Sequence, residues 1–413
     1  MRRLLVFGLL FVSILSVHGQ GFSLSDLEKK LLENNALLAS QQLAIQEAEA
    51  QKKQAKVWSN PSLSISQINL WKTYDVDYMP PLIGNYGRSQ QVAIDLEQEI
   101  QTAAKRKKRM AIADALILDQ KYEYQDLQTR LKWQLGLSFY KCGFLYQQRS
   151  ILDSLSSVYE KLLSAYKNNF EKQLITQTSL FRVQTEVNAI VKKSIELENE
   201  LNTAFQTLKI LTRDSSLNLT DINFQPIPNN LSEQLSNSPV SNSLHIKKQE
   251  NEIQRAQKEL DLELAKRSPD LTLSLSYDRG GNMMKDFVGL GLKFSLPIVD
   301  QNKGNIQAAK INVQRETIEK EQLELDLVYQ LESLQNKLLA YERQIQILQS
   351  NKLENDWKLL NSYVKQLELK QISLLEFIDF THAYLEAKIM ESELYIDYFN
   401  AYQEIKYLMG YEN

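Results

Sequence analysis

Two stretches in the second half of the chain alternate between apolar and small or polar residues. The apolar positions fall on every second residue: Leu271, Leu273, Leu275 and Tyr277, then Val288, Leu290, Leu292, Phe294 and Leu296. A period of two places these side chains on one face of a strand. Asp278–Asn282 supplies turn residues between the two strands. Each of the two stretches is about as long as a strand that crosses a bilayer, which has roughly 9–11 residues. A hairpin packed on a soluble core shows the same pattern, so both readings stay open.

The same order of segments occurs twice. The first half predicts a helix at Leu24–Trp58, strands at 62–71 and 90–97, a long helix at 98–172 and a helix at 174–212. The second half predicts a helix at Ser241–Arg267, strands at 270–277 and 287–297, a long helix at 300–369 and a helix at 371–409. Asn60-Pro61 and Ser268-Pro269 end the first helix of each half. Residues 214–240, which hold three prolines among Asn and Ser, form a connector.

The two halves correspond residue by residue at nearly constant offsets. Pro61 and Pro269 differ by 208, and Leu211 and Leu408 differ by 197. The last helix of each half carries a line of mostly apolar residues at heptad spacing, which we call its heptad seam. Adding 197 to the seam positions of the first half gives the seam positions of the second. We therefore predict two internal repeats, 20–213 and 241–413. Helices this long bury only narrow apolar faces, so we predict that they pack along one another as a rod or tube.

Residues 1–19 predict a secretory signal peptide. Arg2 and Arg3 precede the apolar stretch Leu4–Val17, and Gly19 precedes the expected cleavage site. An N-terminal membrane anchor is the alternative. No later stretch reaches the roughly 18 apolar residues of a transmembrane helix, so a mature chain that enters a membrane must do so as a barrel.

The order of elements resembles that of the TolC family of outer-membrane efflux channels. Three short motifs add to the resemblance: Phe294–Ile298 at a strand-to-helix junction, Thr102–Arg106 with Ala where the family often carries Gly-Gly, and Ile372–Asp379 at a helical tip. The resemblance implies a mixed α and transmembrane β fold. In that fold, three chains with four strands each build one 12-stranded β-barrel, which a long periplasmic α-helical barrel continues. The tip and the Lys-Arg motif are most similar to those of the heavy-metal (CzcC-like) branch.

The resemblance also implies a function and its sites. A homotrimer in the outer membrane of a Gram-negative bacterium would be the passive duct of a tripartite efflux system, with a periplasmic adaptor and an inner-membrane pump of RND type. Lipid would contact Leu271, Leu273, Leu275, Leu290, Leu292 and Phe294. The adaptor would dock at Gln173, Leu174, Ile175 and Thr176, and at Lys370, Gln371, Ile372 and Ser373. Glu376 and Asp379 share a helix face and would ring the periplasmic entrance. The alternatives for these two acids are a solvated face or pairing with Arg182.

Composition and a few individual residues exclude or favour other classes of function. Lys and Arg number 48 against 51 Asp and Glu, so no basic field indicates nucleic acid. No catalytic group, cofactor motif or metal spacing is apparent, which predicts a protein that is not an enzyme. The only cysteine, Cys142, fits helix packing. The basic run Lys105–Arg109 fits either anionic lipid head groups or a solvated face. A periplasmic coiled-coil adaptor or scaffold is the alternative to the duct.

Overall fold

The computed structural model describes residues 21–66, 80–81, 83, 91–235, 240–279, 286–350 and 356–410. Several predicted segments fall outside these ranges. They are the signal peptide at 1–19, the end of the first predicted strand at 67–71, the Gly280-Gly281 turn, and the loop Lys72–Ser89 apart from residues 80–81 and 83.

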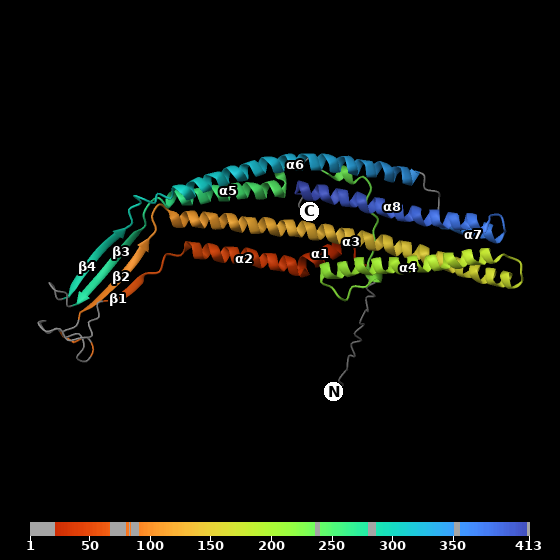
Figure 1. The fold of residues 1–413 in the computed structure, drawn as a ribbon, viewed down its shortest axis with the longest axis horizontal. Helices are drawn as coiled ribbons and strands as arrows, with labels where there is room; N and C mark the ends of the chain where they lie inside the picture. Colours follow the sequence, from red (N-terminus) through yellow and green to blue (C-terminus); the bar gives the residue numbers. More distant parts are fainter. Residues whose placement is uncertain are drawn as a thin grey trace, which may run out of the picture. The chain divides into compact units, whose positions relative to one another are not determined.

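The described elements follow the order helix, strands, long helix, helix in each half (Figure 1). The first half contains α1 (Leu24–Asn34), α2 (Ala36–Lys56), β1 (Ser62–Ser66), β2 (Val92–Ile100), α3 (Lys105–Glu171) and α4 (Gln177–Thr212). The connector holds the short 3-10 helices η1 (Leu219–Asp221) and η2 (Leu231–Gln234), and η3 (Val240–Asn242) begins at its last residue. The second half contains α5 (Leu244–Ala265), β3 (Leu271–Arg279), β4 (Phe287–Phe294), α6 (Lys303–Ser350), α7 (Asp356–Glu368) and α8 (Leu374–Met409).

The element bounds repeat at the offsets seen in the sequence. Both α4 and α8 have 36 residues, and both of their ends differ by 197. The first residues of α2 and α5 differ by 208. The duplication therefore extends from sequence to the placement of helix ends.

The chain forms two compact units. The sheet unit comprises Leu37–Leu127, Ser236–Leu334 and Ile405–Asn413, and the tip unit comprises Met1–Ala36, Gln128–Leu235 and Gln335–Glu404. The sheet unit contains the four described strands in the order β1-β2-β3-β4, with every neighbouring pair antiparallel (Figure 1).

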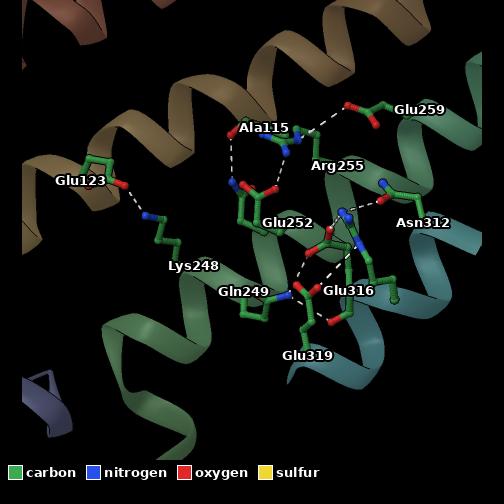
Figure 2. Close-up of polar contacts among 12 residues, drawn as sticks. Ala115, Glu123, Lys248, Gln249, Glu252, Arg255, Glu259, Asn312, Glu316 and Glu319 are labelled. Carbon is green, nitrogen blue, oxygen red and sulfur yellow. Dashed lines mark hydrogen bonds and ion pairs between the residues drawn. The ribbon is translucent and has the colours of Figure 1, made fainter. Parts of the chain in front are cut away.

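Polar contacts join the helices of the sheet unit. Figure 2 shows Gln249 of α5 donating to Glu316 of α6 at 3.0 Å, and Lys248 of α5 paired with Glu123 of α3. The Asn251 side chain, 2% exposed, donates to the Ala115 carbonyl of α3 at 2.9 Å. These contacts hold α5 to both long helices, because a buried amide that loses its partner costs stability.

The tip unit is built on the predicted heptad seam of α4. The seam positions buried in this helix are Val183, Ile190, Leu197, Leu201, Ala204, Leu208 and Leu211. In α8, Phe377 and Tyr398 are fully buried at the matching seam. Cys142 of α3 is buried as well, and burial raises the pKa of its thiol to about 12. The steps of three and four along these helices therefore mark their packed faces.

Three predicted boundaries are wrong. The strand predicted at 287–297 ends at Phe294, and residues 295–297 are not part of β4. Gln98–Ile100 belong to β2 and not to the long helix, because they continue the ladder opposite Leu271–Leu273. Their Glu- and Gln-rich composition favours helix locally, and the ladder pairing overrides it. The first predicted helix is divided at Asn35, whose side chain donates to the Leu211 carbonyl at 3.0 Å. This contact caps the end of α4, and no Gly or Pro announces it in the sequence.

Candidate functional site

The sheet has one apolar face. Partners in an antiparallel ladder project to the same side, and the register places these residues together: Leu63, Ile65, Ile94, Leu96, Ile100, Leu271, Leu273, Leu275, Tyr277, Val288, Leu290, Leu292 and Phe294. The same register adds Val92 at one end of this face, and its polar members are Gln98 and the buried Arg279, which pairs with Val92. All six residues predicted to contact lipid lie on this face. Leu290 is 89% exposed and Leu292 is 58% exposed, so these leucines are open to solvent in the single chain.

The opposite face of the sheet is small, polar and acidic. It carries Ser62, Ser64, Ser66, Ala93, Asp95, Glu97, Glu99, Thr272, Ser274, Ser276, Asp278, Gly289, Gly291 and Lys293, and Phe287 at one end is its one large apolar residue. A Cβ atom on Gly289 would lie 2.7 Å from the Ser276 hydroxyl, so the glycine leaves room for its cross-strand neighbour. Three of its acids, Asp95, Glu97 and Glu99, occupy alternate positions of β2. A water-filled space beside this face would therefore be lined by small side chains and negative charge.

A clasp of polar contacts joins the start of α3 to the start of β3. The Lys105 ammonium donates to Asp270 at 2.8 Å and to the Ser268 carbonyl at 2.7 Å, and its residue is 7% exposed. The Thr102 amide donates to the same carboxylate at 2.9 Å. Burial raises the pKa of Asp270, but the contacts with Lys105 and Thr102 outweigh it and hold this pKa below 3.8. The clasp therefore contributes stability above that pH and loses it as the pH falls further.

Two alanines in the same turn adopt a left-handed backbone. Ala103 has φ of 48° and Ala104 has φ of 56°. An L-residue pays roughly 1–2 kcal/mol for this conformation, and glycine does not. These are the positions of the Gly-Gly pair in the related motif, so the departure from that motif introduces strain here.

Glycine at these positions is expected to stabilise the sheet unit. Ala103→Gly and Ala104→Gly should each raise the free energy of unfolding in detergent micelles by up to about 1 kcal/mol, the relief of strain being partly offset by chain entropy. Ala111→Gly in the helical part of α3 is the matched control and should lower it by about 1 kcal/mol. Destabilisation at all three positions would contradict the left-handed assignment.

The two helical tips have the same backbone structure. Gln173 and Lys370 both adopt a left-handed conformation, with φ of 60° and 58°. The Leu174 amide donates to the Asn169 carbonyl at 2.9 Å, and the Gln371 amide donates to the Gln366 carbonyl at 2.8 Å. Both are the six-to-one bond of a Schellman motif, in which Gly is the usual left-handed residue. This chain therefore meets the conformational requirement of both turns with Gln and Lys instead of Gly.

The second tip adds a capping box. The Ser373 amide donates to the Glu376 carboxylate at 2.7 Å, and the Glu376 amide donates to the Ser373 hydroxyl at 3.2 Å. These bonds lower the pKa of Glu376 below its ordinary value in the single chain. The first tip has the N-cap Thr176, but Ser179 stands where Glu376 stands in the second. Glu376 therefore stabilises the start of α8 as part of a capping box, a role that its sequence motif alone did not predict.

The other candidate residues have ordinary surroundings. Asp379 is exposed on α8, near Glu376 in sequence. His382 contacts Glu186 at 2.7 Å, and His245 packs edge-on against Tyr407 at 4.8 Å. Across the described residues, no group of three His, Cys, Asp or Glu side chains is arranged to hold a metal ion. Within the same ranges, no helix is both long and apolar enough to span a membrane.

Comparisons with known proteins find the same architecture in outer membrane channels. Residues 235–368 match the model of the outer membrane efflux protein family (OEP). The channel CmeC of Campylobacter jejuni superposes with a TM-score of 0.74 over 94% of this chain and 85% of its own, at 13% identity. The prediction of a TolC-like fold is confirmed. The outer membrane protein VceC of Vibrio cholerae shares this fold with a TM-score of 0.68, over 94% of this chain and 96% of its own, at 13% identity.

A curated relative matches at the level of sequence. The cobalt-zinc-cadmium resistance protein CzcC of Cupriavidus metallidurans is 25% identical over 172 residues, which are 42% of this chain. The match spans 40% of that protein's length. With the family match and the solved channels, it confirms the resemblance to TolC-family outer membrane efflux proteins.

Several features of the sheet, its junction with the helices and the tips could not be read from the sequence. The clasp joins Lys105 to a residue 165 positions away, and no local pattern announces such a pair. The acidic row of β2 was divided because Glu99 was assigned to the helix. Its signal was present, since Asp95, Glu97 and Glu99 keep the period of two. The left-handed residues at the tips had no signal either, because Gln173 and Lys370 are not residue types that mark this conformation.

Proposed function

We propose that three copies of this chain form a passive outer-membrane duct that carries substrate out of a Gram-negative cell. One observation carries the proposal: a four-stranded sheet with one apolar and one small, polar face joins directly to long helices. A membrane barrel needs this division, because lipid contacts one face of each strand and water the other. The apolar residues Leu271, Leu273, Leu275, Leu290, Leu292 and Phe294 would then contact lipid.

The edges of the sheet support an assembly of several chains. Among the described strands, β1 pairs only with β2 and β4 only with β3, so each sheet has two open edges. In a bilayer, unpaired edge groups cost several kcal/mol each, and closing the barrel removes them. Three sheets joined β4 to β1 would give the 12-stranded barrel that the resemblance implies.

The helices support the same assembly. Ile311, Ile318 and Leu325 lie seven residues apart on α6 and are 53%, 65% and 54% exposed. An exposed apolar stripe at heptad spacing fits packing against another helix. A neighbouring copy of this chain is the occupant that also closes the barrel.

An outer-membrane location and a trimer can be tested together. The protein should fractionate with the outer membrane, and unheated samples should migrate on denaturing gels as a trimer that boiling converts to the monomer. A soluble periplasmic monomer would contradict the proposal and favour an adaptor or scaffold.

The tips are proposed to dock a periplasmic adaptor, which would couple the duct to an inner-membrane pump of RND type. Leu174 is 70% exposed at the first tip, and the second tip presents Gln371 and Ile372 in the same turn geometry. A photo-crosslinker at Gln173 or Lys370 is expected to capture the adaptor in intact cells. The same group at Lys161, about three turns away along α3, is the control. Crosslinks confined to other copies of this chain would show that the tips only pack together.

Glu376 and Asp379 are proposed to form a ring of six carboxylates at the periplasmic mouth of the trimer. Such a ring favours cations and binds divalent ions. The double variant Glu376→Gln, Asp379→Asn is well suited to a test, because Gln also completes a capping box and preserves the tip. In planar bilayers the wild type should be blocked by divalent cations added from the periplasmic side, and the double variant should not.

Block by divalent cations tests the proposed carboxylate ring more specifically than cation selectivity does, because the acidic residues of β2 also favour cations. Asp95, Glu97 and Glu99 would keep the barrel selective for cations in either protein. Asp95→Asn with Glu97→Gln is therefore the control that should lower selectivity and leave the block in place. An unchanged block in the Glu376, Asp379 double variant would remove these two residues from the mouth.

A further inference from the structure

The first turns of α3 carry a concentration of positive charge that helix stability does not explain. Lys105–Arg109 are all basic, and no acidic residue occurs in the first turn. Bases at a helix N-terminus oppose the helix dipole, which favours acids there. The clasp accounts for Lys105, and Lys108 donates to the Asp261 carbonyl at 2.9 Å. Lys107 and Arg109 are exposed, although Arg109 also donates to the Gln101 side chain, and Arg106 is half-buried.

The end of α2 brings more charge and an exposed aromatic residue to the same place. The Arg106 guanidinium lies 4.3 Å from the centre of the Trp58 ring. Trp58 is 53% exposed, and Lys53 and Lys56 precede it in the last turn of α2. Lys53, Lys56, Trp58, Arg106, Lys107 and Arg109 together are called the basic junction.

Exposed apolar residues occur at this end of the sheet as well. After β4, Leu296, Ile298 and Val299 are 65%, 72% and 96% exposed. Leu296 lies two residues beyond the end of β4, next to the face proposed to contact lipid. Exposed Trp and apolar side chains beside Lys and Arg are typical of the boundary between hydrocarbon and water.

We propose that the basic junction binds the head groups of anionic phospholipids in the leaflet nearest the helices. This inference rests on the proposed membrane function. The charge of the junction is complementary to phosphodiester head groups, and its position continues the proposed lipid face. Trp58 would lie at head-group depth, and Arg106, stacked on its ring, would present its guanidinium to a phosphate. Lys53, Lys56 and Lys107 would add attraction that weakens with salt.

Fluorescence quenching at Trp58 tests this binding. The full-length protein is reconstituted into vesicles that contain brominated phosphatidylglycerol or brominated phosphatidylcholine, and quenching that disappears in Trp58→Phe is assigned to Trp58. Phosphatidylglycerol should quench Trp58 more strongly at low salt. The preference should fall by roughly fivefold for each charge removed in Lys53→Gln, Lys56→Gln, Lys107→Gln, since one basic residue at an anionic surface contributes about 1 kcal/mol.

The control variant removes three exposed lysines from the last turns of α3 and the residue that follows it. Lys161→Gln, Lys167→Gln, Lys172→Gln changes net charge equally and should keep the preference. Equal quenching by the two lipids, or an equal loss in both triple variants, would overturn the proposal. Absence of Trp58 quenching in a protein that inserts and conducts would overturn it as well, and would leave the channel function standing. A protein that does not insert would refute the membrane function itself.

Discussion

An arginine at position 290 is expected to abolish most assembly of the trimer. Leu290 lies on the apolar face and is 89% exposed in the single chain. A charge on the lipid face of a barrel costs about 2–4 kcal/mol at mid-depth, and the trimer would carry three of them. Leu290→Arg should therefore strongly reduce the heat-sensitive trimer in outer-membrane fractions.

Ser274→Arg is the matched control for this substitution. Ser274 lies on the neighbouring strand β3 and points to the polar face. Arginine there would enter a space bordered by Glu97, its partner on β2, and by Gly291 on β4. Trimer should persist with altered conductance. Equal losses for the two substitutions would show that the two faces are not lipid and water.

Loss of the clasp carboxylate is expected to destabilise the sheet unit by about 3 kcal/mol. Asp270→Ala would leave Lys105 buried without its counter-ion and the Thr102 amide without its acceptor. The free energy of unfolding of the protein in detergent micelles measures this loss. Lys105→Met added to Asp270→Ala should recover part of it, because the uncompensated charge is removed.

An exposed ion pair supplies the control. Lys52 and Asp114 also pair between α2 and α3, with side chains 39% and 50% exposed. Asp114→Ala should therefore cost less than about 1 kcal/mol. If both substitutions cost the same, the clasp is no more than a surface ion pair.

The sequence predicted most where a local pattern repeats. The alternation of Leu271–Tyr277 and Val288–Phe294 assigned six residues to one face, and the ladder register places all six there. The offset of 197 aligned Gln173 with Lys370, and the two turns share the same hydrogen bonds. Both predictions rest on periodicity, which backbone geometry enforces directly.

The sequence failed where distant residues decide the local structure. Asn35 ends α1 because the Leu211 carbonyl accepts from its side chain, and those residues are far apart in the chain. Gln98–Ile100 join β2 because β3 offers a partner. Lys105 stands in a run that indicates a solvated or lipid-facing surface, and it is instead buried against Asp270. Each case depends on a tertiary contact that overrides local propensity.

The central claim is that copies of this chain enclose a water-filled pore through a membrane. Single-channel recording of the purified protein in planar lipid bilayers tests it most directly. The account predicts stepwise insertions of uniform conductance, a preference for cations over anions, and a change in conductance for Ser274→Arg. A correctly folded, helical protein that produces no conductance steps would contradict it.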